Sequence, residues 1–322
     1  MVKKTDGLMK YLRDTHGIQI NGSHQKQKLR NIGYYHGFKG YRFIKQPNRR
    51  IIFTDFNEIM ALNKFDMELK TLFYPQMMFI ETALKNYMLE VIVKHARTDS
   101  FDQVYENHLT YYKTHHIGSD DYKKALQNRL KLRNQFYSVL SRDYLLGKPI
   151  VQHFYHKDEY VPIWAIFEVI SLGEFGNFIA CSNINMKRDI SNLLKINIAF
   201  DTDGRMTEII TFLLKDLRNA LAHNEAIFDT RFKRSRINGT LCRLINNETS
   251  IPNITFETIV DYLILTVYLL KNLGVTKTEL HQLVRKFENI INDFRAEIPF
   301  TVYSRILYTN TVTKLNLLKN FI

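Results

Sequence analysis

Residues 206–224 read MTEIITFLLKDLRNALAHN, a strongly apolar stretch with helical spacing. The apolar positions repeat every three and four residues, so they fall on one face of a helix. These positions are Ile209, Ile210, Leu213, Leu214, Leu217 and Leu221. A stripe of this width must be buried against other elements, and the stretch therefore predicts a core helix.

Arg218 and His223 lie five positions apart at the end of this helix. At about 100° per residue, they flank the apolar stripe on opposite sides, about 140° apart. The side away from the stripe is mixed, with Phe212, Lys215, Asn219 and Ala222, and we expect it to face a second surface. Asn219 precedes His223 by one turn, so its amide is able to orient the imidazole.

Arg218, Asn219 and His223 are the predicted catalytic residues of a metal-independent ribonuclease. RNA carries its own nucleophile, the 2′-hydroxyl, so the enzyme has to move protons and neutralise charge on the phosphorane. A histidine titrates near neutral pH and transfers the protons. An arginine presents a permanently charged planar fork that matches phosphate oxygens. The same pair also fits a solvated helix end, where a histidine is a favourable cation beside the last carbonyls.

The run Arg218-Asn219-Ala220-Leu221-Ala222-His223 resembles the Arg-Asn-x-x-x-His signature of HEPN ribonucleases. Three other regions resemble the Abi-like (AbiD/AbiF) abortive-infection branch, in the family's order, so that the resemblance spans roughly residues 29–232. They are Leu29-Arg30-Asn31-Ile32-Gly33-Tyr34-Tyr35 with Gly40-Tyr41; Phe65-Asp66-Met67-Glu68-Leu69 with Ile80-Glu81-Thr82-Ala83-Leu84-Lys85; and Val161-Pro162-Ile163-Trp164 with Leu172-Gly173-Glu174-Phe175.

This resemblance implies a HEPN-like multi-helix bundle and an abortive-infection or toxin-type endoribonuclease with an Arg-x4-His site. HEPN nucleases generally have two such motifs facing one another, and this chain holds one, so the resemblance implies a homodimer with a composite site. It also implies association with a structured non-coding RNA, which can restrain a toxin.

The chain departs from related patterns at three places. Many family members follow the histidine with another His or Ser and then Arg-Leu-Trp, whereas residues 224–228 read Asn-Glu-Ala-Ile-Phe here. HEPN toxins paired with nucleotidyltransferase antitoxins resemble Arg-x4-His-x-Tyr, whereas Glu225 stands at the last position here. Control by modification of that tyrosine is therefore not expected. Lys85 stands where the family often has arginine, which keeps the charge but loses the planar fork.

The charge of the chain favours an RNA partner. Its net charge is +13, and a strongly basic chain concentrates polyanions on its surface. No acidic residue occurs between Lys26 and Arg50, where cations alternate with aromatics, the combination that holds single strands. The predicted RNA-binding residues are Lys39, Arg42, Arg49 and Arg50 here, and Arg231, Lys233, Arg234 and Arg236 after the motif. The alternative is a solvated basic face with its aromatics turned into the core.

The rest of the chain predicts an all-α protein with additional N- and C-terminal helices. Helical spacing covers roughly residues 3–16, 55–96, 122–145, 163–181, 190–196, 207–228, 255–273, 277–297 and 302–318. At most a minor β element is expected, near residues 34–53 and 240–245. No linker is evident, so residues 1–322 are expected to form one unit, with a basic and aromatic N-terminal part (1–60) and a HEPN-like core (61–322).

We expect no metal and no cofactor, because the two cysteines, Cys181 and Cys242, lack metal-ligand spacing and no phosphate loop occurs. Neither a secretory signal nor a membrane span is evident, which predicts a cytoplasmic protein. Two other functions stay open. A non-catalytic RNA-binding protein of the same fold would carry the same basic tracts, and a protein-binding scaffold would need no basic cleft.

Overall fold

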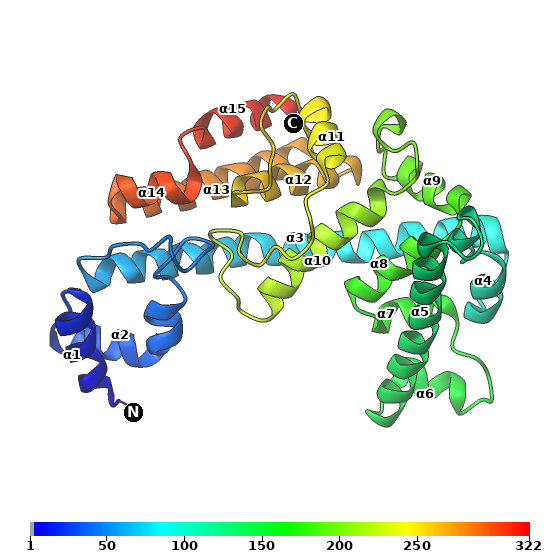
Figure 1. The fold of residues 1–322 in the computed structure, drawn as a ribbon, viewed down its shortest axis with the longest axis horizontal. Coiled ribbons are helices and arrows are strands. Elements are labelled where there is room, and N and C mark those ends of the chain that lie inside the picture. The colour runs from blue at the N-terminus through cyan, green and yellow to red at the C-terminus, as the bar shows by residue number, and fades with distance from the viewer. Residues whose placement is uncertain (1–2) are drawn as a thin grey trace. The chain divides into compact units, whose positions relative to one another are not determined.

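The computed structural model describes residues 3–322 (Figure 1). Over this range the chain forms fifteen α-helices and no sheet, which confirms the all-α prediction. Two isolated β-bridges occur, Gln19 with Asp55 and Phe43 with Arg50. The minor element expected near residues 34–53 is thus a single bridge in a loop. The one expected near residues 240–245 is wrong, because these residues belong to helix α11 (Gly239–Thr249).

The chain divides into two compact units. The first comprises residues up to Gln76, Asp216–Ile237 and Ile245–Ile322, and the second comprises Met77–Lys215 and Asn238–Leu244. Helices α3 (Phe56–Ala96), α10 (Met206–Ala222) and α11 each contribute residues to both units. The N-terminal part expected over residues 1–60 falls inside the first unit.

The first unit is built on α12 (Ile259–Asn272), which is buried at every position from Ile259 to Leu270. Its one acidic residue, Asp261, is neutralised by Lys314, with Nζ 2.6 Å from Oδ1. The other helices of this unit are α1 (Thr5–His16), α2 (Gly22–Tyr34), the π-helical turn η1 (Tyr35–Lys39), α13 (Lys277–Glu297), α14 (Phe300–Leu307) and α15 (Thr311–Phe321). Among the helices of residues 3–322, none is long and apolar enough to span a membrane.

The second unit contains the remaining helices. They are α4 (Phe101–Asn107), the 3-10 turn η2 (Tyr111–Thr114), α5 (Asp120–Leu145), α6 (Pro149–Tyr155), α7 (Ile163–Val169), α8 (Leu172–Cys181), α9 (Ile184–Leu193) and the 3-10 turn η3 (Ile198–Phe200). The helix predicted over residues 163–181 is two helices, because Ser171 and Glu174 form a capping box that starts α8 afresh. Lys85 of α3 donates to the carbonyl of Ile170 at this junction (2.9 Å).

Helix α8 covers one side of α10. A Cβ atom added to Gly176 would lie 3.1 Å from the Phe212 ring, and one added to Gly173 would lie 3.3 Å from Lys215. These two glycines let the helices come close. The part of the mixed face of α10 that carries Phe212 and Lys215 is therefore covered within the chain.

Candidate functional site

The candidate site lies at the C-terminal end of α10. The apolar stripe of this helix is buried as predicted, apart from the half-buried Ile209. The helix ends at Ala222, six residues earlier than predicted. The amide of His223 still donates to the carbonyl of Asn219 (2.9 Å), and Asn224 then adopts a left-handed conformation with φ 53°. A residue of this conformation commonly terminates a helix, and asparagine tolerates it better than most side chains.

The three predicted catalytic residues differ in their surroundings. His223 is exposed, whereas Arg218 and Asn219 are half-buried. Arg218 Nη1 donates to Asn219 Oδ1 at 3.4 Å, so the amide oxygen contacts the guanidinium rather than the imidazole. Within residues 3–322, no hydrogen bond or ion pair involves the His223 side chain. Its imidazole is therefore accessible to a substrate.

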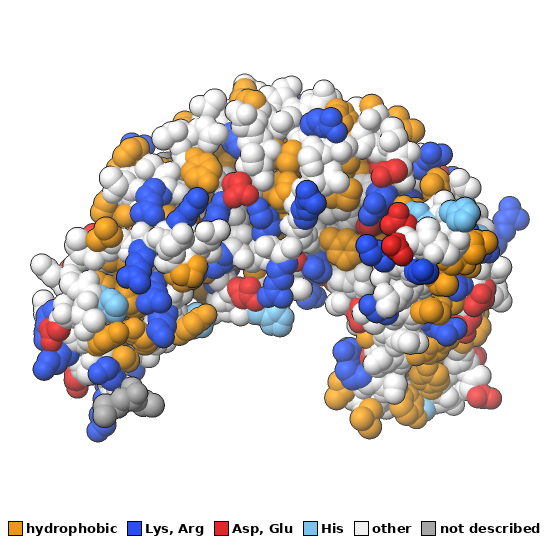
Figure 2. Space-filling model, in the orientation of Figure 1, with side chains coloured by type: hydrophobic (Ala, Val, Ile, Leu, Met, Phe, Trp, Pro, Cys, Tyr) orange, Lys and Arg blue, Asp and Glu red, His pale blue; other side chains and the backbone are white. Residues whose placement is uncertain are grey.

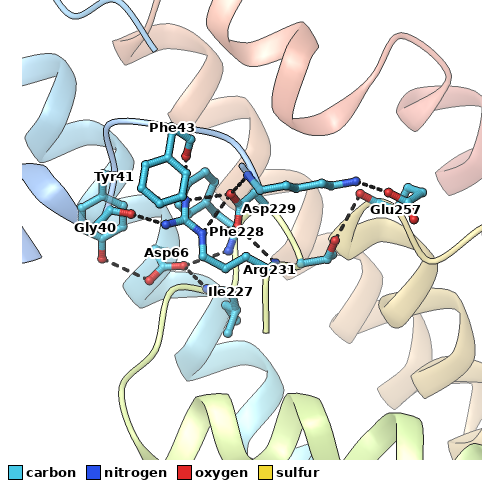
Figure 3. Close-up of polar contacts among 11 residues, drawn as sticks. Gly40, Tyr41, Phe43, Asp66, Ile227, Phe228, Asp229, Arg231 and Glu257 are labelled. Atoms are coloured by element: carbon cyan, nitrogen blue, oxygen red, sulfur yellow. Dashed lines mark hydrogen bonds and ion pairs between the residues drawn. The ribbon is translucent and has the colours of Figure 1, made fainter. Parts of the chain in front are cut away.

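Asp66 of α3 fixes the loop that follows His223. Its side chain is fully buried, and its Oδ1 accepts the amides of Ile227 (2.7 Å) and Phe228 (2.9 Å) (Figure 3). The hydroxyl of Tyr41 donates to Oδ2 at 3.1 Å. A buried carboxylate is costly unless its lone pairs are satisfied, and here they are satisfied by the loop just after the motif helix and by Tyr41 of the N-terminal stretch.

Lys70 connects this carboxylate to the motif. Its ammonium lies 2.7 Å from Asp66 Oδ2 and 2.8 Å from Asn224 Oδ1. Lys70 follows Asp66 by one helical turn in α3, a spacing at which side chains are neighbours. The lysine therefore holds the side chain of the residue next to His223.

A second buried carboxylate anchors the far end of the same loop. Asp216, within α10, accepts the amides of Arg234 (2.9 Å) and Ser235 (2.6 Å) at Oδ2. The loop of residues 223–237 is thus held at two points, by Asp66 and by Asp216. This double anchoring fixes the backbone on which the second basic cluster stands.

The Arg231 side chain makes hydrogen bonds both within this loop and to the N-terminal stretch. Its guanidinium contacts Asp229 through Nε (2.8 Å) and Nη2 (2.7 Å), and it donates to the carbonyls of Gly40 and Phe43, both at 2.6 Å (Figure 3). It also lies over the Phe43 ring, 4.3 Å from the centroid. These contacts join the loop to the basic and aromatic N-terminal stretch.

Glu257 neutralises two further cations. It pairs with Lys233 (2.6 Å) and with Lys45. Burial alone would raise the pKa of Glu257, but the hydrogen bonds and the positive charges of Lys233 and Lys45 together outweigh burial and lower the pKa from its ordinary value. Lys233 is therefore part of an ion-pair network within the first unit.

The remaining predicted RNA-binding residues are more accessible. Lys39, Arg49, Arg50, Arg234 and Arg236 are exposed, and Arg42 is half-buried. The Arg234 side chain is 76% exposed and lies 3.5 Å from Glu225.

Every predicted catalytic and RNA-binding residue belongs to the first unit. Figure 2 shows basic side chains spread over the face that it displays, with acidic ones fewer. The RNA-binding roles of Arg231 and Lys233 stay predictions, and both cations already have acidic partners.

The aromatic residues of the N-terminal stretch divide between the core and the surface. Phe38 and Tyr41 are buried, whereas the Tyr35 side chain is 67% exposed. Half-buried Tyr34 lies beneath the Lys39 ammonium, 5.6 Å from its ring centroid. The interpretation that the aromatics belong to the core therefore applies to Phe38 and Tyr41 and not to Tyr35.

Sequence reasoning assigned no role to Asp66, Lys70, Asp216 or Asp229. The sequence does carry a signal for Asp66 and Lys70. Asp66 interrupts an apolar helical pattern, and Lys70 follows it by four residues, the spacing of an ion pair along a helix. The two amides that Asp66 accepts, from Ile227 and Phe228, lie about 160 residues away in the chain, and spacing alone does not identify them. In the described residues, no group of three or more His, Cys, Asp or Glu side chains could hold a metal ion.

Comparison with known proteins identifies the family of the chain. The model of the family described as Abi-like protein matches residues 27–229, which is more than half of the chain. The matched region contains Tyr41, Asp66, Lys70 and the motif from Arg218 to His223. Neither the curated proteins nor the solved structures gave a match. The chain belongs to the Abi-like protein family.

Proposed function

We propose that this protein is a metal-independent endoribonuclease of the abortive-infection type, with Arg218 and His223 in its active site. The observation that carries the proposal is the pairing of an accessible imidazole with a tightly anchored backbone. His223 has no side-chain partner within residues 3–322, while the residues that follow it are fixed by Asp66 and Lys70. An imidazole without a partner, carried on a fixed backbone, is available to transfer protons in general acid–base catalysis.

The reaction would proceed through the 2′-hydroxyl of the RNA. One His223 accepts the proton of this hydroxyl as its oxygen attacks the adjacent phosphorus. The bond from phosphorus to the 5′-oxygen of the next nucleotide breaks, and this oxygen receives a proton from a protonated imidazole. The products are a 2′,3′-cyclic phosphate and a 5′-hydroxyl. Arg218 would stabilise the negative charge of the phosphorane, and Asn219 would support the guanidinium.

Two imidazoles make this proton transfer efficient, because one acts as base while the other acts as acid. Since the chain holds one motif, we propose a homodimer in which two copies of His223 and Arg218 line one cleft. Ala222 and His223 are both exposed, so this end of α10 is accessible to a second copy. A strictly monomeric mass by light scattering, with RNA bound, would contradict the composite site.

Outside the catalytic cleft, the exposed cations would bind the RNA backbone. Arg234 and Arg236 stand on the anchored loop a few residues after His223, and Lys39 and Arg49 stand on the N-terminal stretch. Arg231 and Lys233 would support this surface mainly by holding the loop, through Asp229 and Glu257. A structured non-coding RNA is a second ligand that such a surface would bind.

Single substitutions separate catalysis from binding. We expect His223→Ala to lower the cleavage rate by about 10²–10⁴-fold, the usual range for a general acid–base residue, with little change in RNA affinity. Arg218→Ala would weaken both, because a phosphate contact is lost with the stabilisation of the transition state. The measurements are cleavage of labelled RNA and binding of non-cleavable 2′-O-methyl RNA.

Matched controls come from the same chain. His116 is exposed on a loop and Arg285 is exposed on α13, so His116→Ala and Arg285→Ala remove the same groups outside the proposed site. Both should cleave like the wild type. Equal loss of cleavage in His223→Ala and His116→Ala would count against a catalytic role for His223.

A non-catalytic RNA-binding protein is the second candidate. Two observations favour it. One chain holds a single Arg-x4-His motif, and Arg218 contacts Asn219 within the chain. Salt-sensitive RNA binding by a wild-type protein that cuts no RNA would support it.

A further inference from the structure

The first unit contains a small cavity that the catalytic proposal does not use. It has a volume of about 160 Å³ and lies between the end of α1, the turn η1 and the loop that leads to α3. The lining residues are His16, Ile18, Phe38, Arg42, Arg50, Ile51, Ile52 and Phe53. At ~30 Å³ per water molecule, this is room for about five waters, or for one phosphate group with part of its sugar.

Two arginines line this cavity without acidic partners. Across residues 3–322, neither Arg42 nor Arg50 makes an ion pair, and no acidic residue lines the cavity. Other cations of the same unit are neutralised, as Lys70 is by Asp66 and Arg231 is by Asp229. Two positive charges that line one partly enclosed space repel each other. An anion bound between them would attract both, so the net electrostatic interaction would become favourable.

A histidine adds an unsatisfied polar atom. The Nε2 atom of His16 is buried and has no hydrogen-bond partner. Its ring is held by an edge contact with Tyr11 and a tilted contact with Phe38, at centroid distances of 5.0 and 4.7 Å. A buried polar atom without a partner costs free energy. His16 lines the cavity together with the two arginines.

The other lining residues are apolar. Ile18, Phe38, Ile51 and Phe53 are all at most 5% exposed, whereas Ile52 is 81% exposed at the rim. An inorganic anion would gain little from such walls. A ligand that joins an anionic group to a flat apolar one would use both parts of the cavity.

Charge selects among anions of this type. An internal phosphodiester carries one negative charge, whereas a terminal phosphomonoester carries about 1.5 to 2 at pH 7. The two positive charges of Arg42 and Arg50 match the charge of a terminal phosphomonoester better than that of a phosphodiester. Each guanidinium is also able to bind phosphate oxygens with two parallel hydrogen bonds. We propose that Arg42, Arg50 and His16 form a pocket for the terminal phosphate of a nucleotide, either at an RNA end or on a free mononucleotide. This proposal goes beyond cleavage and does not require a catalytic His223.

The test compares RNA ends on one scaffold. A short single-stranded 2′-O-methyl oligonucleotide, which the 2′-hydroxyl reaction cannot cut, is prepared with a 5′-phosphate, with a 3′-phosphate or with neither, and binding is followed by fluorescence anisotropy. We expect wild-type protein to bind one phosphorylated form about tenfold or more tightly than the unphosphorylated form, as charge-assisted hydrogen bonds imply. Equal affinity for all three forms would overturn the proposal.

Variants assign the preference to the pocket. Arg42→Gln and Arg50→Gln should each bring the ratio of the dissociation constants, for the unphosphorylated form and for the preferred phosphorylated form, close to one. Arg50 is exposed, so its variant keeps the test valid if Arg42→Gln does not fold. The matched control is Arg49→Gln, from the same loop and outside the cavity lining, which should weaken all three forms equally and leave the ratio unchanged. A ratio that falls as much in Arg49→Gln would overturn the assignment to this pocket.

A competition arm identifies the source of the phosphate. If adenosine monophosphate displaces the phosphorylated oligonucleotide with a similar dissociation constant, the ligand is a free nucleotide. If it fails to compete while the end preference persists, the ligand is an RNA end. Both results support the phosphate chemistry, and neither depends on whether His223→Ala abolishes cleavage.

Discussion

The Lys70 ammonium lies 2.8 Å from the side-chain oxygen of Asn224, the residue directly after His223. This contact links α3 to the end of the motif helix across more than 150 positions of the chain. Because Lys70 is also paired with the buried Asp66, the geometry of the motif's end depends on a carboxylate that is remote in sequence.

Replacing the buried carboxylate should destabilise the protein. Asp66→Asn leaves Lys70 without its ionic partner in a buried setting, and we expect a loss of about 2–4 kcal/mol in the free energy of unfolding. Urea denaturation measures it. Asp120→Asn is the control, because the Asp120 side chain is 96% exposed and should change stability by less than about 0.5 kcal/mol. A similar small change in Asp66→Asn would show that the Asp66 contacts contribute little.

The positive φ of Asn224 can be separated from its hydrogen bond. Asn224→Gly and Asn224→Val both lose the contact with Lys70, but only valine carries the steric penalty of a left-handed conformation, about 1–2 kcal/mol. We therefore expect the valine variant to unfold at a lower urea concentration than the glycine variant. Identical midpoints for the two variants would argue against the left-handed helix end.

The helix ends illustrate what the sequence could predict. The helix over residues 277–297 was predicted from its apolar spacing with the bounds that the structure has, where Thr276 and Glu279 form a capping box at its start. The motif helix was predicted too long, since Ile227 and Phe228 continue the apolar pattern. They are buried, but in a loop whose amides bind Asp66. Burial explains the pattern in both cases, and periodicity does not tell a buried loop from a buried helix.

The candidate site was predictable only in part. The spacing of Arg218 and His223 predicted that both lie at the C-terminal end of one helix, which the structure has, whereas their catalytic roles stay predictions. The contact of Asn219 with Arg218 rather than with the imidazole depends on side-chain conformers that spacing does not fix. In the same way, a row of cations after the motif does not reveal that Arg231 and Lys233 have acidic partners, because Asp229 is near in sequence but Glu257 is not.

The two arginines of the second cluster that stay exposed should contribute to RNA binding without affecting stability. Replacing Arg234 and Arg236 together by alanine should reduce the slope of log affinity against log salt concentration by about 0.7 for each lost phosphate contact. The melting temperature should stay unchanged. An unaltered slope would indicate that these side chains do not contact phosphates.

Arg231 should behave in the opposite way. Arg231→Lys keeps the charge but cannot reach Asp229 and the carbonyls of Gly40 and Phe43 at the same time. We expect a loss of about 1–3 kcal/mol in unfolding free energy, with an unchanged salt slope of RNA binding. A variant as stable as the wild type would contradict the internal role of this guanidinium.

Folding stability should fall at mildly acidic pH. The pKa of His16 is lowered by burial, and further by Arg42 and Arg50, and the pKa of His108 is lowered by burial and by His95. The unfolded chain therefore binds more protons below about pH 6.5, so stability is present above that value and is lost as pH falls toward the folded-state pKa. Urea midpoints at about pH 7.5 and about pH 5.5 measure the loss, and His16→Gln should reduce it. A midpoint that rises on acidification would contradict the direction of these shifts.

The measurement that tests the central claim most directly is the chemistry of the RNA ends. Total cellular RNA is incubated with wild-type protein or with His223→Ala in excess EDTA, and the ends of the fragments are identified. We predict fragments with 2′,3′-cyclic phosphate and 5′-hydroxyl ends in the wild-type reaction and intact RNA with the variant. Intact RNA in both reactions, or cleavage that persists in His223→Ala, would contradict the account.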